Sequence, residues 1–228
     1  MAKILSIHEL RETMWPEWLQ DAFGENLVSA FLHGDCLMEG FNPFKEHWLM
    51  SFTLHDDSPG AISQIQGLLR QAEKDKLDFG YFFTQNFYDT AADTFPLELL
   101  HISQRNVPII GESPLSGFVP DRRALRLQCE RELRGALIRL TSIFAYRTRK
   151  RTSLDFFLEA EKMLLPTLYG IRFLETNEYP STKDSVYRAY PFLKLDPPGS
   201  ADEVVSARAG DYIVELKQIL AHVDKMEV

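Results

Sequence analysis

The chain has 228 residues, of which 45% are hydrophobic and 12% aromatic. That content is enough for a buried core in one large domain or two small ones, and it excludes an intrinsically disordered chain. Lys and Arg number 25 against 33 Asp and Glu, which gives a net charge of −8. We therefore expect no non-specific attraction of the whole chain to nucleic acid or to an anionic membrane.

The spacing of the two cysteines and the length of the apolar runs indicate the cellular compartment of the protein. Cys36 and Cys129 lie far apart, with no spacing typical of a metal site or a disulfide framework. Apolar runs are shorter than the roughly 18 residues that a membrane helix needs. Residues 1–12 reach acidic side chains too early for a signal peptide. We expect a cytoplasmic protein with reduced thiols and no membrane partner.

The first predicted element is a helix over residues 7–23 that ends at Gly24. Its expected apolar stripe comprises Leu10, Met14, Trp18 and Ala22. Pro16 is expected to kink or divide this helix, because proline lacks the amide proton that a helix interior uses.

Short apolar runs then alternate with helical patterns. Strands are expected at 27–32, 48–54, 77–83 and 107–110. A helix begins after Ser58 with Ile62, Ile65 and Leu69 on one face, and another begins near 95–100. The pattern predicts a small mixed-sheet domain in which helices cover one face.

Residues 111–120 contain two glycines and two prolines and form the best candidate linker. We place the domain boundary near Gly117, which gives an α/β domain over 1–117 and a helical domain over 118–228. Residues 121–151 carry ten Lys or Arg and three Asp or Glu, a net charge of +7 that leaves −15 for the rest.

The second half is predicted to be a helical bundle. A long helix is expected from Leu125, with Cys129, Leu133, Ala136, Leu137, Leu140 and Phe144 on its apolar face. Ser153 is expected to cap a second helix that Pro166 kinks and that ends at Leu174. Further helical segments are expected at 186–190 and from Asp202, with a turn at 196–199. The fold class is thus α+β.

Residues 26–54 read as an apolar strand, a glycine turn, a polar loop and a second apolar strand. This layout resembles the opening of the nucleotidyltransferase superfamily, of the kanamycin nucleotidyltransferase and minimal nucleotidyltransferase type. The runs FPLELLHI (95–102) and IIGESPL (109–115) also resemble the end of that domain. The resemblance implies a nucleotidyltransferase-like domain followed by a helical bundle.

In active members, the resemblance implies a Gly-Ser turn that holds the triphosphate and carboxylates that hold two divalent cations for attack on the α-phosphate. Here the turn reads Gly34-Asp35, and the Asp-x-Asp position reads His47-Trp48-Leu49. Asp78 stands where a third carboxylate is expected. One carboxylate does not build a two-metal site, so we expect a vestigial site with no catalytic residues, no metal and no cofactor.

Three local alternatives remain open. Asp35 is either a loop-surface acid or a substitute metal ligand. The other loop acids are either solvated or rebuild a metal site; they are Glu39, Glu46, Asp56 and Asp57. The six histidines show no helical metal-ligand spacing, although His33 and His47 are expected near each other across paired strands; the others are His8, His55, His101 and His222.

Two other clusters have competing interpretations. The basic run 147–151 suits a solvated helix end or a phosphate or nucleic-acid contact. The aromatic cluster of Phe79, Tyr81, Phe82 and Phe83 suits a core better than a base-stacking platform.

The leading hypothesis is a nucleotidyltransferase-like protein that has lost catalysis and acts in binding or assembly, with an unidentified protein or nucleotide as its partner. One rival is an active, Mg²⁺-dependent nucleotidyltransferase with a relocated metal site. The other is a nucleic-acid or partner-binding module that uses the basic face between Arg122 and Arg151.

Overall fold

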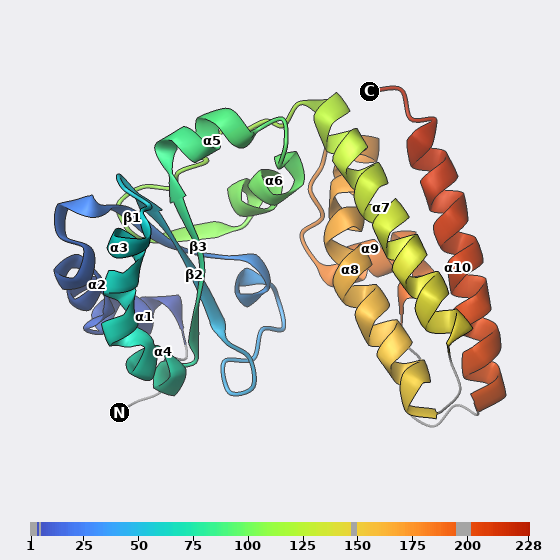
Figure 1. Ribbon diagram of the computed structural model, residues 1–228, viewed down its shortest axis with the longest axis horizontal. Helices are drawn as coiled ribbons and strands as arrows, with labels where there is room; N and C mark the ends of the chain where they lie inside the picture. Colours follow the sequence, from blue (N-terminus) through green and yellow to red (C-terminus); the bar gives the residue numbers. More distant parts are fainter. Residues whose placement is uncertain (1–3, 5, 147–149, 195–201) are drawn as a thin grey trace. The chain divides into compact units, whose positions relative to one another are not determined.

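The computed structural model describes residue 4 and residues 6–146, 150–194 and 202–228. At residues 150–155 and 202–207 it describes the backbone alone. The chain divides into two compact units. A sheet unit comprises Met1–Ala92 and Glu98–Val119, and a helical unit comprises Asp93–Leu97 and Pro120–Val228. The α+β class expected from the sequence is confirmed (Figure 1).

The sheet has four strands in the order β3-β2-β1-β4. Their bounds are β1 Leu27–His33, β2 Trp48–Leu54, β3 Leu77–Thr84 and β4 Asn106–Ile110. β1 is antiparallel to both β2 and β4, whereas β2 and β3 are parallel. All four expected strands are confirmed, and the sheet is mixed.

Two short helices precede the sheet where one long helix was expected. They are α1 (Ile7–Glu12) and α2 (Trp15–Phe23), separated by an extended Thr13. Pro16 lies in the first turn of α2, where its missing amide proton has no helical partner to lose. The break shifts the apolar stripe. Met14, expected to be buried, is 48% exposed, and Trp15 and Leu19 are fully buried instead.

The crossover from β2 to β3 is also less regular than expected. It contains α3 (Pro59–Ile62), a 3₁₀ segment (Ser63–Leu68) and α4 (Leu69–Asp75). Ser58 caps α3 as expected, and its hydroxyl accepts the amide of Ala61. The 3₁₀ segment has three residues per turn, fewer than an α-helix. The residues after it therefore point in other directions than in one continuous α-helix. Leu69 is therefore 52% exposed rather than buried.

Helices contact both faces of the sheet, which corrects the expectation that they cover one face. The larger core lies between α1, α2, the β2–β3 crossover and one face of the sheet. On the other face, Phe31 packs with Tyr88 of α5 (Gln85–Ala91) and with Leu99 and Ile102 of α6 (Pro96–Gln104). Figure 1 shows α5 and α6 away from the α1–α4 group.

The helical unit contains the bundle expected from the sequence. Its helices are α7 (Arg122–Ala145), α8 (Lys150–Thr176), α9 (Lys183–Ala189) and α10 (Asp202–Asp224). The expected α7 stripe is buried at Leu125, Cys129, Leu133, Ala136 and Leu140, while Phe144 is 36% exposed. Cys36 and Cys129 are both buried, and they form no disulfide with each other.

The start of α8 differs from the expectation. α8 begins at Lys150, so Ser153 lies inside the helix and is not its N-cap. As expected, the helix continues through Pro166, and the kink expected at this residue stays a prediction. The expected turn at 196–199 lies outside the described residues. The division between units falls after Val119, and it also assigns 93–97 to the helical unit.

Residues 93–97 are attached to the bundle by specific contacts. The buried Gln128 side chain accepts a hydrogen bond from the Leu97 amide at 2.9 Å. A Cβ placed on Gly170 of α8 would lie 2.4 Å from Leu97 Cδ1 and 3.0 Å from Cys129 Sγ. Glycine at position 170 therefore lets the Leu97 side chain reach the bundle core.

No helix within the described part of the chain has both the length and the apolar character that crossing a membrane requires.

Candidate functional site

The strand directions bring three predicted site positions to one end of the sheet. β1 ends where the antiparallel β2 begins, and β3 begins beside β2. Leu49 is in register with Asp78, and a Cβ on Gly34 would lie 3.9 Å from Leu49 Cδ2. Gly34 has φ +79°, a conformation that suits glycine. We call Gly34, Asp35, His47, Leu49 and Asp78 the strand-end site.

Two polar side chains of the strand-end site, His47 and Asp78, contact each other. His47 Nδ1 lies 2.9 Å from Asp78 Oδ1, and the two side chains are 42% and 61% exposed. Each group thus has a partner from the neighbouring strand region. Leu49, between them in sequence and partly buried, presents hydrocarbon to the same region.

Asp35 lies in the 3₁₀ turn Gly34–Leu37, directly after β1. Its side chain is exposed, which agrees with a loop-surface acid. The adjacent Cys36 is buried, and desolvation raises the pKa of its thiol. A buried neutral thiol is a poor nucleophile.

A second histidine, His33, ends β1 and is buried. His33 is 6% exposed, and burial lowers its pKa to about 4, so its imidazole is neutral near pH 7. Its Nε2 lies 2.8 Å from Ser51 Oγ. The same oxygen accepts the main-chain amide of Tyr81 at 2.7 Å. Ser51 Oγ therefore accepts from the Tyr81 amide and also hydrogen-bonds the His33 ring.

The contact between Ser51 and the Tyr81 amide lies at a bulge in β3. The β2–β3 register shifts between Met50 and Phe52, where two residues of β3 lie opposite Ser51. At this bulge, the Ser51 hydroxyl accepts the Tyr81 amide. A Cβ on Gly80 would lie 2.7 Å from Ser51 Oγ and 3.4 Å from His33 Nε2. Ser51 is fully buried, which excludes it as an accessible nucleophile.

The aromatic cluster of β3 is divided between the two faces. Phe79 and Phe82 pack on Phe52 in the larger core. On the opposite face, Tyr81 stacks on His33 and on Phe83, with centroid distances of 5.6 and 5.0 Å. Sequence reasoning assigned the whole cluster to the core, but Tyr81 is 44% exposed.

The loop acids belong to local turns or lie in solvent. Glu46 accepts the amide of Asn42, and Asp56 accepts both the amide and the hydroxyl of Ser58. The Ser58 contacts lower the pKa of Asp56. Within the described residues, no three His, Cys, Asp or Glu side chains converge as metal ligands would.

The basic face of α7 is largely engaged in ion pairs. Arg126 and Arg134 both bind Glu130, and Arg139 binds Glu159. Residues 147–149 lie outside the described residues, and nothing is described of the side chains of Lys150 and Arg151. Four arginines of this face thus have acidic partners: Arg126, Arg131, Arg134 and Arg139.

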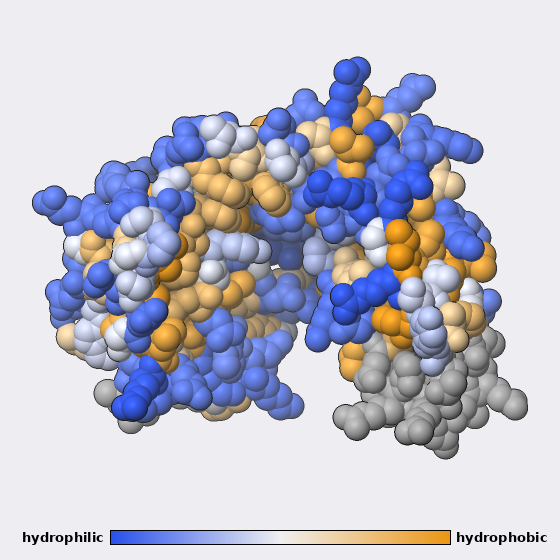
Figure 2. All heavy atoms as spheres, in the orientation of Figure 1, coloured by the Kyte–Doolittle hydropathy of each residue, from blue (hydrophilic) through white to orange (hydrophobic). Residues whose placement is uncertain are grey.

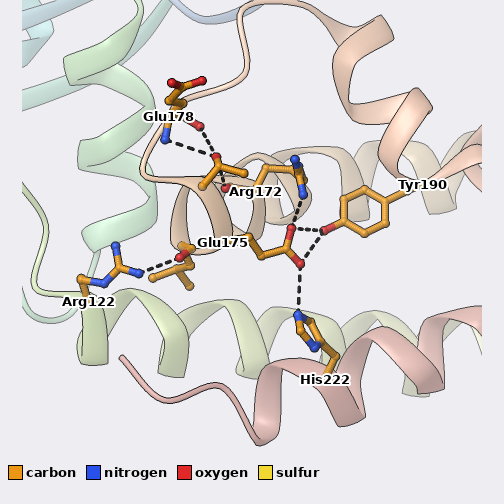
Figure 3. Close-up of polar contacts among 8 residues, drawn as sticks. Arg122, Arg172, Glu175, Glu178, Tyr190 and His222 are labelled. Carbon is orange, nitrogen blue, oxygen red and sulfur yellow. Dashed lines mark hydrogen bonds and ion pairs between the residues drawn. The ribbon is translucent and has the colours of Figure 1, made fainter.

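The helical unit contains a polar cluster that sequence reasoning missed (Figure 3). Glu175, near the end of α8, accepts from Arg172, from Tyr190 and from His222 Nε2 at 3.1 Å. Burial, with the Glu175 charge as a second cause, raises the pKa of Tyr190. Tyr190 and His222 lie 15 and 47 residues from Glu175 and form no motif with it, so only tertiary packing reveals the cluster.

Arg122 secures the end of α8 beside this cluster. Its guanidinium donates to the Leu174 carbonyl and to Asn177 Oδ1, each at 2.6 Å. Asn177 has φ +59°, the left-handed conformation that often follows a helix. The contacts satisfy a carbonyl in the last turn, which indicates a structural role.

No protein-family model matches this sequence, and no curated protein matches it either.

Proposed function

We propose that this chain is a nucleotidyltransferase-like protein that has lost catalysis and acts in binding or assembly. The observation that carries the proposal is the 2.9 Å contact between His47 and Asp78. It occupies the strand end where the resemblance places a pair of metal-binding carboxylates.

Two-metal phosphoryl chemistry needs several anionic oxygens around the cations. At this strand end, Asp78 supplies one carboxylate, and His47 is its partner. The Leu49 side chain lies between the backbones of Gly34 and Gly80, with its Cδ1 3.2 Å from a Cβ placed on Gly80. A methyl group cannot ligate Mg²⁺. These residues therefore favour a role in binding or assembly over catalysis.

The rival of a relocated metal site requires Asp35 and Asp78 to act together with further ligands. It predicts that labelled nucleotide is incorporated into an acceptor with Mg²⁺ or Mn²⁺. Incorporation that Asp35→Ala or Asp78→Ala abolishes would establish that rival and refute the proposal.

The decisive experiment restores the missing carboxylates. We expect the double variant His47→Asp with Leu49→Asp to gain Mg²⁺ affinity in calorimetry, because two new carboxylates would join Asp78. The matched control is His55→Asp with Leu69→Asp, which makes the same substitutions at two exposed positions. We expect no gain in that control.

The result would contradict the proposal if the unmodified protein, with nucleotide, already bound two Mg²⁺ ions as tightly as the restored variant. A thermal-shift screen of nucleotides with and without Mg²⁺ supplies the binding arm. A ligand of the folded state raises its stability by mass action, so a metal-independent shift indicates retained nucleotide binding.

A further inference from the structure

The two edges of the sheet are protected to different degrees. β4 carries Pro108, which has no amide proton, and the Pro108 carbonyl accepts a hydrogen bond from Arg11. Proline and a capped carbonyl both prevent a further strand from pairing. β3 forms the other edge, and within the described residues no segment hydrogen-bonds to its outer side.

The bulge divides β3 into two segments and changes the alternation of side chains between the two faces of the sheet. Gly80 and Tyr81 both face the side of the sheet that carries Ser51 and His33, which interrupts the alternation. From Tyr81 to Thr84 the alternation is regular again. Tyr81 and Phe83 stack together on one face, and Phe82 packs on the other.

This second segment is uncharged and aromatic. Tyr81 is 44% exposed, and Phe82, Phe83 and Thr84 are partly exposed. Figure 2 shows hydrophobic side chains gathered in the part of the sheet unit where Figure 1 places β3. An exposed edge with high β-propensity and no charge is a template for a further strand.

The segment is complementary to itself. In an antiparallel pair centred on Phe82, each Phe82 lies opposite its counterpart on one face. On the other face, each Tyr81 lies opposite a Phe83. The three central side-chain pairs of this register are aromatic, the pair next to them joins Thr84 to Gly80, and no like charges meet. A strand with charged or small side chains would not give these pairs.

We propose that the outer edge of β3, over Tyr81–Thr84, binds the same segment of a second copy of this chain. The two sheets then form one continuous sheet across a two-fold axis. The stacked rings of Phe87, Phe83, Tyr81 and His33 continue into their counterparts in the second copy. This inference names the partner for the proposed role in assembly, and it rests on that role.

Sedimentation of the intact chain over a range of concentrations tests the pairing. We expect a reversible dimer whose dissociation constant rises about tenfold or more in Tyr81→Lys, because two aromatic pairs are lost per dimer. The matched control is Tyr146→Lys, which adds the same charge at a tyrosine that is 82% exposed on the helical unit. We expect that control to dimerise like the unmodified chain.

Amide hydrogen exchange of the unmodified protein gives a readout that does not depend on a variant. Protection of residues 81–84 is expected to increase with protein concentration. A monomer at every concentration, a dimer that Tyr81→Lys leaves intact, or concentration-dependent protection confined to other segments would overturn the inference. Protection that appears only when another protein is added would assign the edge to a foreign strand and would overturn it too.

The two proposals fail separately. A monomeric protein without nucleotide transfer refutes only the edge pairing, whereas a dimer that transfers nucleotides refutes only the loss of catalysis.

Discussion

His33 and Tyr81 are linked through one atom: Ser51 Oγ lies 2.8 Å from His33 Nε2 and 2.7 Å from the main-chain nitrogen of Tyr81. The link spans β1, β2 and β3 at the level of the bulge. It connects the main chain of the β3 bulge to the buried imidazole of His33.

The neutral state of His33 predicts a specific loss of stability in mild acid. Its pKa is about 4 in the folded protein against 6.5 for a free side chain, so the unfolded state binds the proton first as pH falls. Stability is therefore full above pH 6.5 and declines toward pH 4. The loss is about 2 kcal/mol at pH 5.

Urea unfolding at pH 7 and pH 5 measures this loss. We expect His33→Gln to remove the His33 share of the pH dependence and His55→Gln, at an exposed position, to retain it. Equal pH dependence in the unmodified protein and in His33→Gln would refute the assignment.

Gly80 is predicted to be intolerant of a side chain. Gly80→Ala places a methyl group 2.7 Å from Ser51 Oγ, which forces the His33–Ser51–Tyr81 link to shift. We expect a loss of roughly 1–3 kcal/mol in the free energy of unfolding, measured by denaturant titration. The control is Gly67→Ala, where nothing lies within 4 Å of the new atom. A similar loss in both variants would show that packing at the bulge is not the cause.

Two helical glycines are predicted to respond in opposite directions. Gly170→Ala would meet Leu97 and Cys129 and overpack the bundle core, with a loss of roughly 1–3 kcal/mol. Gly135→Ala has open space in the middle of α7 and is expected to stabilise the protein by up to about 1 kcal/mol. Thermal unfolding distinguishes them. Stabilisation by Gly170→Ala would contradict the close approach of α8 to Leu97.

Arg122 is predicted to contribute to stability rather than to nucleic-acid binding. Arg122→Ala removes two hydrogen bonds at the end of α8, and we expect a loss of about 1–2 kcal/mol in urea unfolding. Arg123→Ala removes the same charge at the neighbouring exposed position and serves as the control. Salt-sensitive DNA or RNA binding that both variants weaken equally would favour the rival in which α7 is a nucleic-acid surface.

The strands and long helices were predictable because their apolar patterns are long and regular. β2 has the bounds expected from the sequence, and the α7 stripe is buried as expected up to Leu140. The buried face was predicted wrongly at Met14, where the helix is interrupted, and at Leu69, where a 3₁₀ segment precedes the α-helix. Helix α5 was missed, because its sequence QNFYDTA combines residues that favour caps and turns with aromatic ones.

The strand-end site was predictable in part. Strand order alone brings Gly34, Leu49 and Asp78 together, since β1 ends where β2 and β3 begin. The role of Ser51 was not predictable, because it follows from a bulge that shifts the register by one residue. The Glu175 cluster was missed because α8 and α10 meet only through tertiary packing.

The attachment of residues 93–97 to the bundle has a consequence for modularity. A fragment that starts at Pro120 would leave Gln128 without the Leu97 amide and would leave empty the space that the Leu97 side chain occupies beside Gly170. A fragment that ends at Ala92 would lack α6 and the edge strand β4. Neither fragment contains a complete unit. Recombination or circular permutation of this chain must therefore keep residues 93–97 with the helical unit and residues 98–119 with the sheet unit.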